Sequence, residues 1–335
     1  MNEVIDIKFT GTYEFFSGLT EDGKPDLSKK IWEAKNEIQW NFLDHLGRVA
    51  FQHRPQEWIE DMWSSWNNLQ TAWVAYQPYL FLWTNDTAAT KWDWDAFDDW
   101  MAKVWWDANS PLWCVKDKKV WPIWKSSIYT YDPTTDWGYW KYTMLFKYTP
   151  DESWNIKELW IISRCTRSYN YSNRYKPISR VVPSGWIDVT KDEPIYILYT
   201  IAINTDDSAD WWRLVWGKEF IYKYMLGTGN SYSNYNYVWL STNNDDITTF
   251  DEYYNTDNHI LHKSLDRTTE CDVEENDGKK LQGNIIEADF EDIPADTYKS
   301  MTVFVDWKSF LRKKIDMEVT DSANLYNVKI KIAFK

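Results

Sequence analysis

The chain is poor in the residues and motifs that mark several common protein classes. Its 335 residues include only three cysteines, Cys114, Cys165 and Cys271, which lie far apart. An odd and sparse set of this kind argues against a disulfide scaffold and is typical of a reducing compartment. The sequence also lacks a Walker motif, a dinucleotide-binding glycine pattern and a G-x-S-x-G elbow, so nothing indicates a nucleotide-binding enzyme or a serine hydrolase.

Positive charge and long apolar runs are scarce as well. The chain has 37 basic against 51 acidic residues and a net charge of −14, which repels phosphate backbones and anionic lipid surfaces. The longest apolar runs, such as 194-PIYILYTIAIN, fall short of the roughly 20 residues of a membrane-spanning helix. We therefore expect neither nucleic-acid binding nor membrane insertion. The N-terminus shows no secretory signal pattern, which favours a soluble protein made in a cytoplasm.

Aromatic residues are abundant instead. The chain contains 25 tryptophans, 22 tyrosines and 14 phenylalanines, and the segment 91-KWDWDAFDDWMAKVWWD is the densest in tryptophan and aspartate. With 44% hydrophobic and 26% charged residues, the composition is that of an ordinary folded protein with one large or two medium domains.

The first third of the sequence predicts a strand followed by helices. Residues 4–16 mix apolar and polar positions in an extended pattern. Asp26 is a suitable N-cap for a helix over 27–46, in which Leu27, Ile31, Ala34, Ile38, Phe42 and Leu46 recur at helical spacing. A second helix is expected over 56–76, between two prolines, and a third over 91–108.

The rest of the chain favours β structure. From about residue 112 onward, short runs rich in Val, Ile, Tyr, Thr and Trp alternate with turn residues. The segment 328-VKIKIAF has a strict two-residue alternation, which predicts a strand with one buried face, whereas 268–283 has the composition of a solvated acidic loop. The predicted fold is α+β, mainly antiparallel β and sandwich-like, with an inserted Trp-rich helical region.

These patterns divide the chain into three parts. Residues 1–25 are expected to form an N-terminal strand that joins the β region. Residues 26–110 are the Trp-rich helical region, and residues 111–335 are the antiparallel β region.

Two tryptophans of the densest segment do not fit a helical core. On a helix capped by Thr90 or Asp93, most aromatic residues of 91–108 share one stripe, whereas Trp92 and Trp106 project to the acidic face. A lipid-binding helix has a basic polar face, so a membrane is not the expected partner. Trp92 and Trp106 are therefore candidate contacts to a protein partner or to a glycan, since tryptophan is enriched at protein interfaces and also stacks on sugars.

Metal binding finds little support. His259 and His262 are spaced for one face of a helix, but the surrounding residues fit a strand equally well, which places the two rings on opposite faces. The acidic segment 272-DVEENDGKKLQG departs from a calcium loop at its glycine and at its last ligand. We expect no metal site and no cofactor.

Carboxylates beside aromatic residues leave a polysaccharide hydrolase open. Glycosidases use two carboxylates on opposite sides of a cleft, and Asp93, Asp95 and Glu158 are acidic residues with aromatic neighbours. Sequence spacing does not show which carboxylates converge.

Parts of the β region resemble structural proteins of tailed bacteriophages, of the tail-fibre, baseplate or collar-associated type. The segments that carry the resemblance are 157-KELWIISR, 178-ISRVVPSGWIDVTKDEPIYILYTIAIN and the turn 226-LGTG. In them, a strand with a Glu-Leu pair is followed by Ser-Arg, a proline and a long strand, and the turn is similar to the I-G-T-G turn of such proteins. The resemblance implies a virion location and no catalytic residues.

Three functional hypotheses follow. The first is a non-enzymatic virion protein, made in the host cytoplasm, that acts in tail or collar assembly or fibre attachment. It would form a homo-oligomer and bind other virion proteins through aromatic-rich surfaces. The second is a carbohydrate- or receptor-binding module that uses exposed tryptophans to bind a host surface glycan. The third is the polysaccharide hydrolase.

Overall fold

The computed structural model describes most of the predicted β region and parts of the first third of the chain. The described residues are 2–40, 42–43, 77–83, 88–92, 118–120, 122–132, 137–166, 173–205, 211–213, 237–242, 261–264, 267–277, 279–305, 308–321 and 324–335. Their elements are β1 (Asn2–Phe16), the 3₁₀ helix η1 (Leu27–Lys29), β2 (Lys30–Ile38), β3 (Gln77–Trp83), β4 (Lys118–Val120), β5 (Pro122–Asp132), β6 (Trp137–Tyr148), β7 (Trp154–Ile156), β8 (Glu158–Thr166), β9 (Asn173–Val181), β10 (Ile187–Val189), β11 (Ile195–Thr205), β12 (Trp211–Arg213), β13 (Tyr237–Ser241), β14 (Leu261–Ser264), β15 (Arg267–Asn276), β16 (Lys279–Phe290), β17 (Asp296–Val305), β18 (Lys308–Val319) and β19 (Tyr326–Phe334).

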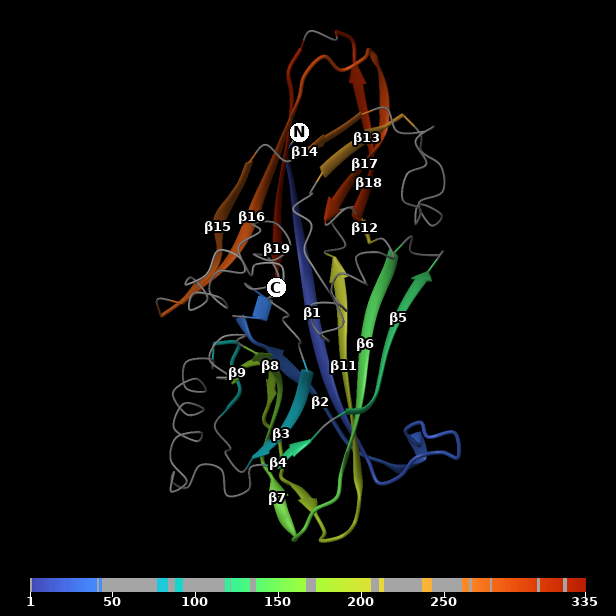
Figure 1. The fold of residues 1–335 in the computed structure, drawn as a ribbon, viewed down its shortest axis with the longest axis vertical. Helices are drawn as coiled ribbons and strands as arrows, with labels where there is room; N and C mark the ends of the chain where they lie inside the picture. Colours follow the sequence, from blue (N-terminus) through green and yellow to red (C-terminus); the bar gives the residue numbers. More distant parts are fainter. Residues whose placement is uncertain are drawn as a thin grey trace.

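These strands form one large sheet and two smaller ones. A twelve-stranded sheet has the order β15-β16-β19-β1-β2-β9-β8-β3-β4, and β11, β6 and β5 continue from the other edge of β1. A five-stranded sheet has the order β12-β18-β17-β13-β14, and β7 pairs with β10 alone. Nearly all neighbours are antiparallel, but β1 and β19 are parallel. Figure 1 shows β1 running along the long axis, with the five-stranded sheet at one end of the molecule and β7 at the other.

The large sheet divides along one edge of β1. The N-terminal part of β1 pairs with β19, and its C-terminal part pairs with β2, starting at Gly11 and Asn36. Lys335 closes the first pairing by bonding Ile7 and Phe9 through the backbone. Gly11 is required where the second begins, because a Cβ there would lie 2.0 Å from Asn36 Oδ1. Both halves of the sheet are therefore anchored on one strand.

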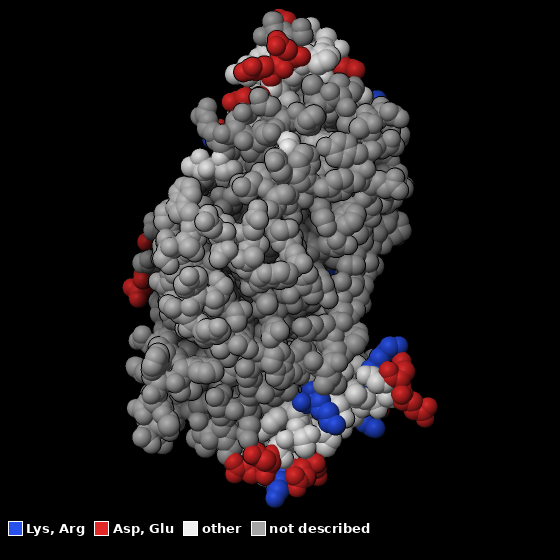
Figure 2. All heavy atoms as spheres, in the orientation of Figure 1, with Lys and Arg blue, Asp and Glu red and all other residues white. Residues whose placement is uncertain are grey.

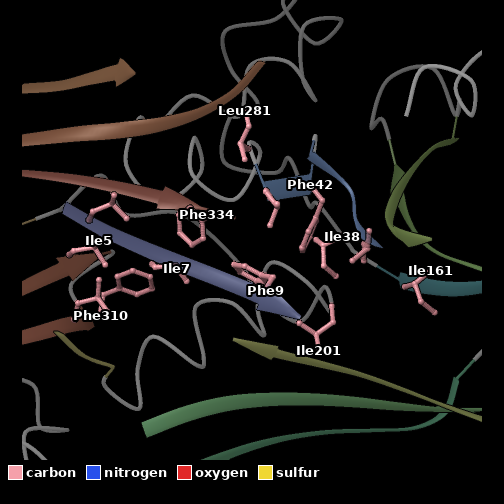
Figure 3. Packing of buried hydrophobic residues seen from close by; sticks show 14 of the residues in the cluster. Ile5, Ile7, Phe9, Ile38, Phe42, Ile161, Ile201, Leu281, Phe310 and Phe334 are labelled. Carbon is pink, nitrogen blue, oxygen red and sulfur yellow. The ribbon is translucent and has the colours of Figure 1, made fainter. Parts of the chain in front are cut away.

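A single hydrophobic cluster fills the space around this division. Alternate residues of β1 point inward and are buried, as the two-residue period of a strand requires. Phe9 packs against Phe334 of β19, with ring centroids 5.9 Å apart, and against Phe42, which follows β2, with ring centroids 6.3 Å apart (Figure 3). Residues of the five-stranded sheet, such as Phe310, belong to the same cluster. The core therefore joins the two larger sheets.

The helix predicted over 27–46 is wrong for residues 27–38; beyond β2, Trp40, Phe42 and Leu43 are helical, and 41 and 44–46 lie outside the described residues. Asp26 does cap a helical turn, since its side chain accepts a hydrogen bond from the Ser28 N–H, but the turn ends at Lys29 and the chain continues as β2. In β2, inward and outward residues alternate toward the buried Ile38. Ala34 and Ile38 fit the helical and the strand period alike, so the apolar spacing alone did not separate the two structures.

Of the remaining secondary-structure predictions, some are confirmed, one is wrong, and others lie outside the described residues. The strands expected at 4–16, in the phage-like segments and at 328–334 are confirmed as β1, β8 to β11 and β19. The acidic loop expected at 268–283 is wrong, because β15 and β16 form a hairpin there. The helices predicted over 56–76 and, beyond Trp92, over 91–108 lie outside the described residues. No helix in the described part of the chain has the length and hydrophobicity of a membrane span.

Candidate functional site

Trp92 lies against the core. Its ring stacks on Trp40 with centroids 5.8 Å apart, and it is half-buried against the main hydrophobic cluster. The segment is held to the end of β2, since the Trp40 N–H donates to the Lys91 carbonyl and Gln39 Nε2 donates to the Thr90 carbonyl. One face of Trp92 thus has a structural role. Trp106, the other predicted contact, lies outside the described residues.

Thr90 makes the contact expected of a helix cap. Its hydroxyl oxygen accepts a hydrogen bond from the Trp92 N–H at 3.2 Å, which is the geometry of a capping side chain. Next to it, Lys91 forms an ion pair with Glu274 of β15 at 2.9 Å. Asp93, the alternative cap, is outside the described residues.

Glu158, one of the candidate hydrolase carboxylates, makes a structural contact. It forms a buried ion pair with Arg180, with 2.5 Å between Oε1 and Nε, and Arg180 also lies over the Trp160 ring and donates to the Ala88 carbonyl. Opposite charges at this distance neutralise each other, and truncating one partner of such a pair is strongly destabilising. The pair joins β8 to β9. Asp93 and Asp95, the other predicted hydrolase carboxylates, are outside the described residues.

The predicted metal-site candidates do not converge where they are described. His262 is in β14, paired with Trp239, and His259 is outside the described residues. The acidic segment from Asp272 runs along both strands of the β15–β16 hairpin, with Asp277 at the turn in a left-handed conformation. In the described part of the chain, no three His, Cys, Asp or Glu side chains are grouped as a metal ion requires.

A folded hairpin connection projects from the body between β1 and β2. Together with the first two residues of β2, Lys30 and Ile31, it comprises residues 17–31, called the arm below, and lies at the lower right of Figures 1 and 2. Its base is closed by backbone hydrogen bonds from Ser17 to Lys29 at 3.0 Å and from Asp26 to Gly18 at 3.2 Å. At its tip, Gly23 has a φ of 76°, which only glycine adopts without strain. The arm is thus an ordered element with its own hydrogen bonds.

Charged and polar side chains at the tip of the arm contact one another. Asp22 and Lys24 form an ion pair at 2.7 Å, and the Thr20 hydroxyl bonds to Asp22 and to the Lys24 backbone. The hydrogen bond from Lys24 lowers the pKa of Asp22, and the same contact raises the pKa of Lys24. Hydrogen bonds from Ser28 likewise lower the pKa of Asp26. Both carboxylates therefore stay ionised below the usual range.

The arm also carries apolar side chains that the core does not use. Leu27 is 76% exposed and Ile31 is 53% exposed, although the helical pattern predicted both to be buried. Ile31 faces outward because Trp32, the next residue of β2, occupies the inward position, and the regular pairing with β1 shifts at Ile31. The strand alternation of Trp32, Ala34, Asn36 and Ile38 was the signal that would have identified Ile31 as an outward residue.

No protein-family model matches this chain, and no curated protein matches it.

Proposed function

We propose that this chain is a non-enzymatic structural protein that holds its neighbours in a symmetric assembly through the arm. The observation that carries the proposal is the exposure of Leu27 and Ile31 on an element that already has a fixed shape. Isolated exposed apolar residues are ordinary on protein surfaces. Here, however, the two belong to a projecting hairpin that contributes none of its apolar side chains to the core.

A preformed arm suits assembly for an energetic reason. Binding is weakened by the entropy lost when loops and side chains become ordered, and a rigid element loses less. The arm has its backbone bonds, its 3₁₀ turn and its ion pairs in place. Ile31 stands between Lys30 and Glu33 in sequence, and these two form an ion pair at 2.7 Å. Apolar anchors bordered by charged side chains are usual at interfaces.

The assembly in this proposal is the virion of a tailed bacteriophage, in its tail, collar or fibre attachment. The support is the resemblance of 157–164 and 178–204 to tail-fibre, baseplate and collar-associated proteins, together with the strands β8 to β11 in those segments. The partners are further copies of the chain and other virion proteins. The same proposal includes a sandwich-like arrangement of the sheets, helices over 56–76 and 91–108, and partner contacts by Trp92 and Trp106.

The arm is tested by a double substitution, Leu27→Ser with Ile31→Ser. Sedimentation velocity over a range of protein concentrations should show oligomers for the wild-type chain, or binding to virion proteins added to it. The variant should require at least about tenfold higher concentration, because two exposed apolar anchors are removed. The urea midpoint should stay within error of the wild type, since neither side chain is in the core.

Leu325→Ser is the matched control, because Leu325 is also an exposed leucine, at 61%, and lies outside the arm. It should leave association unchanged. Equal association of the double variant and the wild type would overturn the role of the arm. For the virion location, the chain should co-sediment with intact phage particles and appear in their maps; a chain found only in the free fraction would contradict it.

A further inference from the structure

An exposed aromatic side chain lies near the opposite end of the molecule from the five-stranded sheet. Trp186 immediately precedes β10, which pairs with β7 in a two-stranded ribbon (Figure 1). Its side chain is 61% exposed. A tryptophan buries more apolar area than other residues when it is covered, so its exposure is the feature to be explained.

The ribbon below Trp186 has a rigid inner face. Ile156, Ile187 and Val189 are buried in the main hydrophobic cluster, and Trp154 packs against it while donating a hydrogen bond to Tyr148 Oη at 3.0 Å. Because side chains alternate along a strand, the residues between them point outward. The outer face of the ribbon is therefore fixed by a packed core and not by a loop.

Strand register places four outward residues together. Ile187 lies opposite Ile156, and Asp188 lies opposite Asn155. One step further along the same antiparallel register, Trp186 lies opposite Lys157. Residues two positions apart on one face of a strand are separated by about 6.6 Å. Asp188 and Asn155 therefore lie beside the Trp186 ring, at a separation comparable with the width of a hexose.

Direct contacts within these pairs confirm the arrangement. Lys157 Nζ lies 4.2 Å from the centroid of the Trp186 ring, as in a cation–π contact. Asn155 Nδ2 donates a hydrogen bond to Asp188 Oδ1. Lysine covers one face of the indole and holds its orientation. The side chain stays 61% exposed although Lys157 lies over one face of the ring.

From this arrangement we infer that Trp186, Lys157, Asp188 and Asn155 form a saccharide-binding subsite. The apolar C–H face of a hexose stacks on the electron-rich face of the indole that Lys157 leaves open. The Asp188 carboxylate beside the ring accepts hydrogen bonds from sugar hydroxyls, and the Asn155 amide donates hydrogen bonds to them. A sugar hydroxyl both donates and accepts, so it needs both kinds of group. The ordered ribbon presents these groups without a conformational change. This subsite is independent of the arm and adds glycan recognition to the proposed assembly role.

A saccharide fits this face better than a macromolecular surface. A stable protein interface buries about 800 Å² on each partner, whereas the outer face of the ribbon offers one aromatic ring among polar side chains. Trp186 is flanked by the exposed Ser184 and Gly185 and by Asp188. One acidic and one basic side chain balance at the site, which suits a neutral sugar better than a phosphate or a sulfate.

Nuclear magnetic resonance of the full chain, labelled in tryptophan, tests the inference. Each of the 25 tryptophans contributes one indole N–H signal, and the signal that disappears in Trp186→Phe is that of Trp186. Maltohexaose, cellohexaose and chitohexaose are added separately to about 10 mM, which saturates a subsite with a dissociation constant of about 1 mM. At least one sugar should shift the Trp186 signal in a saturable manner.

Variants separate stacking from general surface effects. Asp188→Ala and Asn155→Ala should each weaken the response at least fivefold with the fold unchanged, and Trp186→Ala should abolish sugar binding measured by saturation transfer. Leu325→Ala, at an equally exposed apolar residue, and the arm variant Leu27→Ser with Ile31→Ser should bind as the wild type does. If the proposed role of the arm in association is wrong, the sugar-binding result is therefore unaffected.

Three outcomes overturn the inference. The first is no shift of the Trp186 signal with any of the three sugars. The second is a sugar response that persists unchanged in Trp186→Ala, which places binding elsewhere. The third is broadening of the Trp186 signal with protein concentration in the absence of sugar, which shows that a second copy of the chain covers the ring.

Discussion

β19 and β2 occupy the same edge of β1, one after the other, and differ in what they do with their apolar side chains. β19 pairs in parallel with the N-terminal part of β1 and buries Val328, Ile330, Ile332 and Phe334. β2 pairs antiparallel with the C-terminal part, buries Ile38 and leaves Ile31 exposed where the strand continues into the arm. Both strands pair with β1, but β19 buries its apolar side chains in the core, whereas β2 leaves Ile31 exposed to solvent.

This difference concerns how much each partner strand of β1 adds to the stability of the fold. At the β19 end, burial of branched side chains lowers the free energy of the folded chain by about 1.5 to 3 kcal/mol for each fully buried side chain. At the β2 end, Tyr13, Phe15 and Ile38 are buried in the same core, but Ile31 remains exposed and adds little to folding. Both halves of β1 therefore line the core, and only the second half also leads into the arm.

The largest effect expected is the loss of a core isoleucine at the β19 end. Ile332 is fully buried and pairs with Ile5 of β1. Ile332→Ala should lower the free energy of unfolding in urea by about 2 to 5 kcal/mol, because it removes buried methyl groups and leaves a cavity. Ile31→Ala, the same substitution on β2, should stay within about 0.5 kcal/mol of the wild type. Equal losses at both positions would contradict the division between the two strands.

Part of this contrast was predictable from sequence and part was not. β19 was predicted because apolar residues and lysines alternate without a competing pattern. β2 was not predicted, because Ala34 and Ile38 fit both the helical and the strand period. Asp26 also caps a short helical turn as well as it caps a long helix. Neither the parallel pairing of β1 with β19, more than three hundred residues away, nor the exposure of Trp186 has a local signal, since both depend on tertiary packing.

A smaller effect is expected from the tyrosine pair at the β2 end. Tyr13 and Tyr199 stack with ring centroids 4.7 Å apart, and Tyr13 Oη shares a hydrogen bond with Ser179 Oγ at 3.0 Å. Burial raises the pKa of both phenols. A raised pKa means that the folded chain disfavours the phenolate, so stability is complete below about pH 10, the usual value, and falls as pH rises above it.

The loss should approach about 1.4 kcal/mol for each pH unit and each tyrosine until the folded-state pKa is reached. Urea midpoints measured between about pH 8 and about pH 11 give the slope. The double substitution Tyr13→Phe with Tyr199→Phe should flatten it, and Tyr196→Phe, at the half-buried position of β11 that pairs with Lys147, is the control. An unchanged slope in the double variant would show that other groups govern alkaline unfolding.

The smallest effect concerns the arm alone. Ser28 holds the pKa of Asp26 below its ordinary value of 3.8 through hydrogen bonds to its carboxylate, with Lys29 3.6 Å away. Because the folded-state pKa is lowered, the cap is complete above the ordinary value and is lost as pH falls through the lowered one. Hydrogen exchange at the Ser28 amide should therefore accelerate at acid pH, relative to its intrinsic rate, while amides of β19 stay protected. Asp26→Asn should remove this pH dependence, since an amide side chain caps without titrating. A simultaneous loss of protection in β19 would show that the arm and the core unfold as one unit, and that the two ends of β1 are not separate in energy.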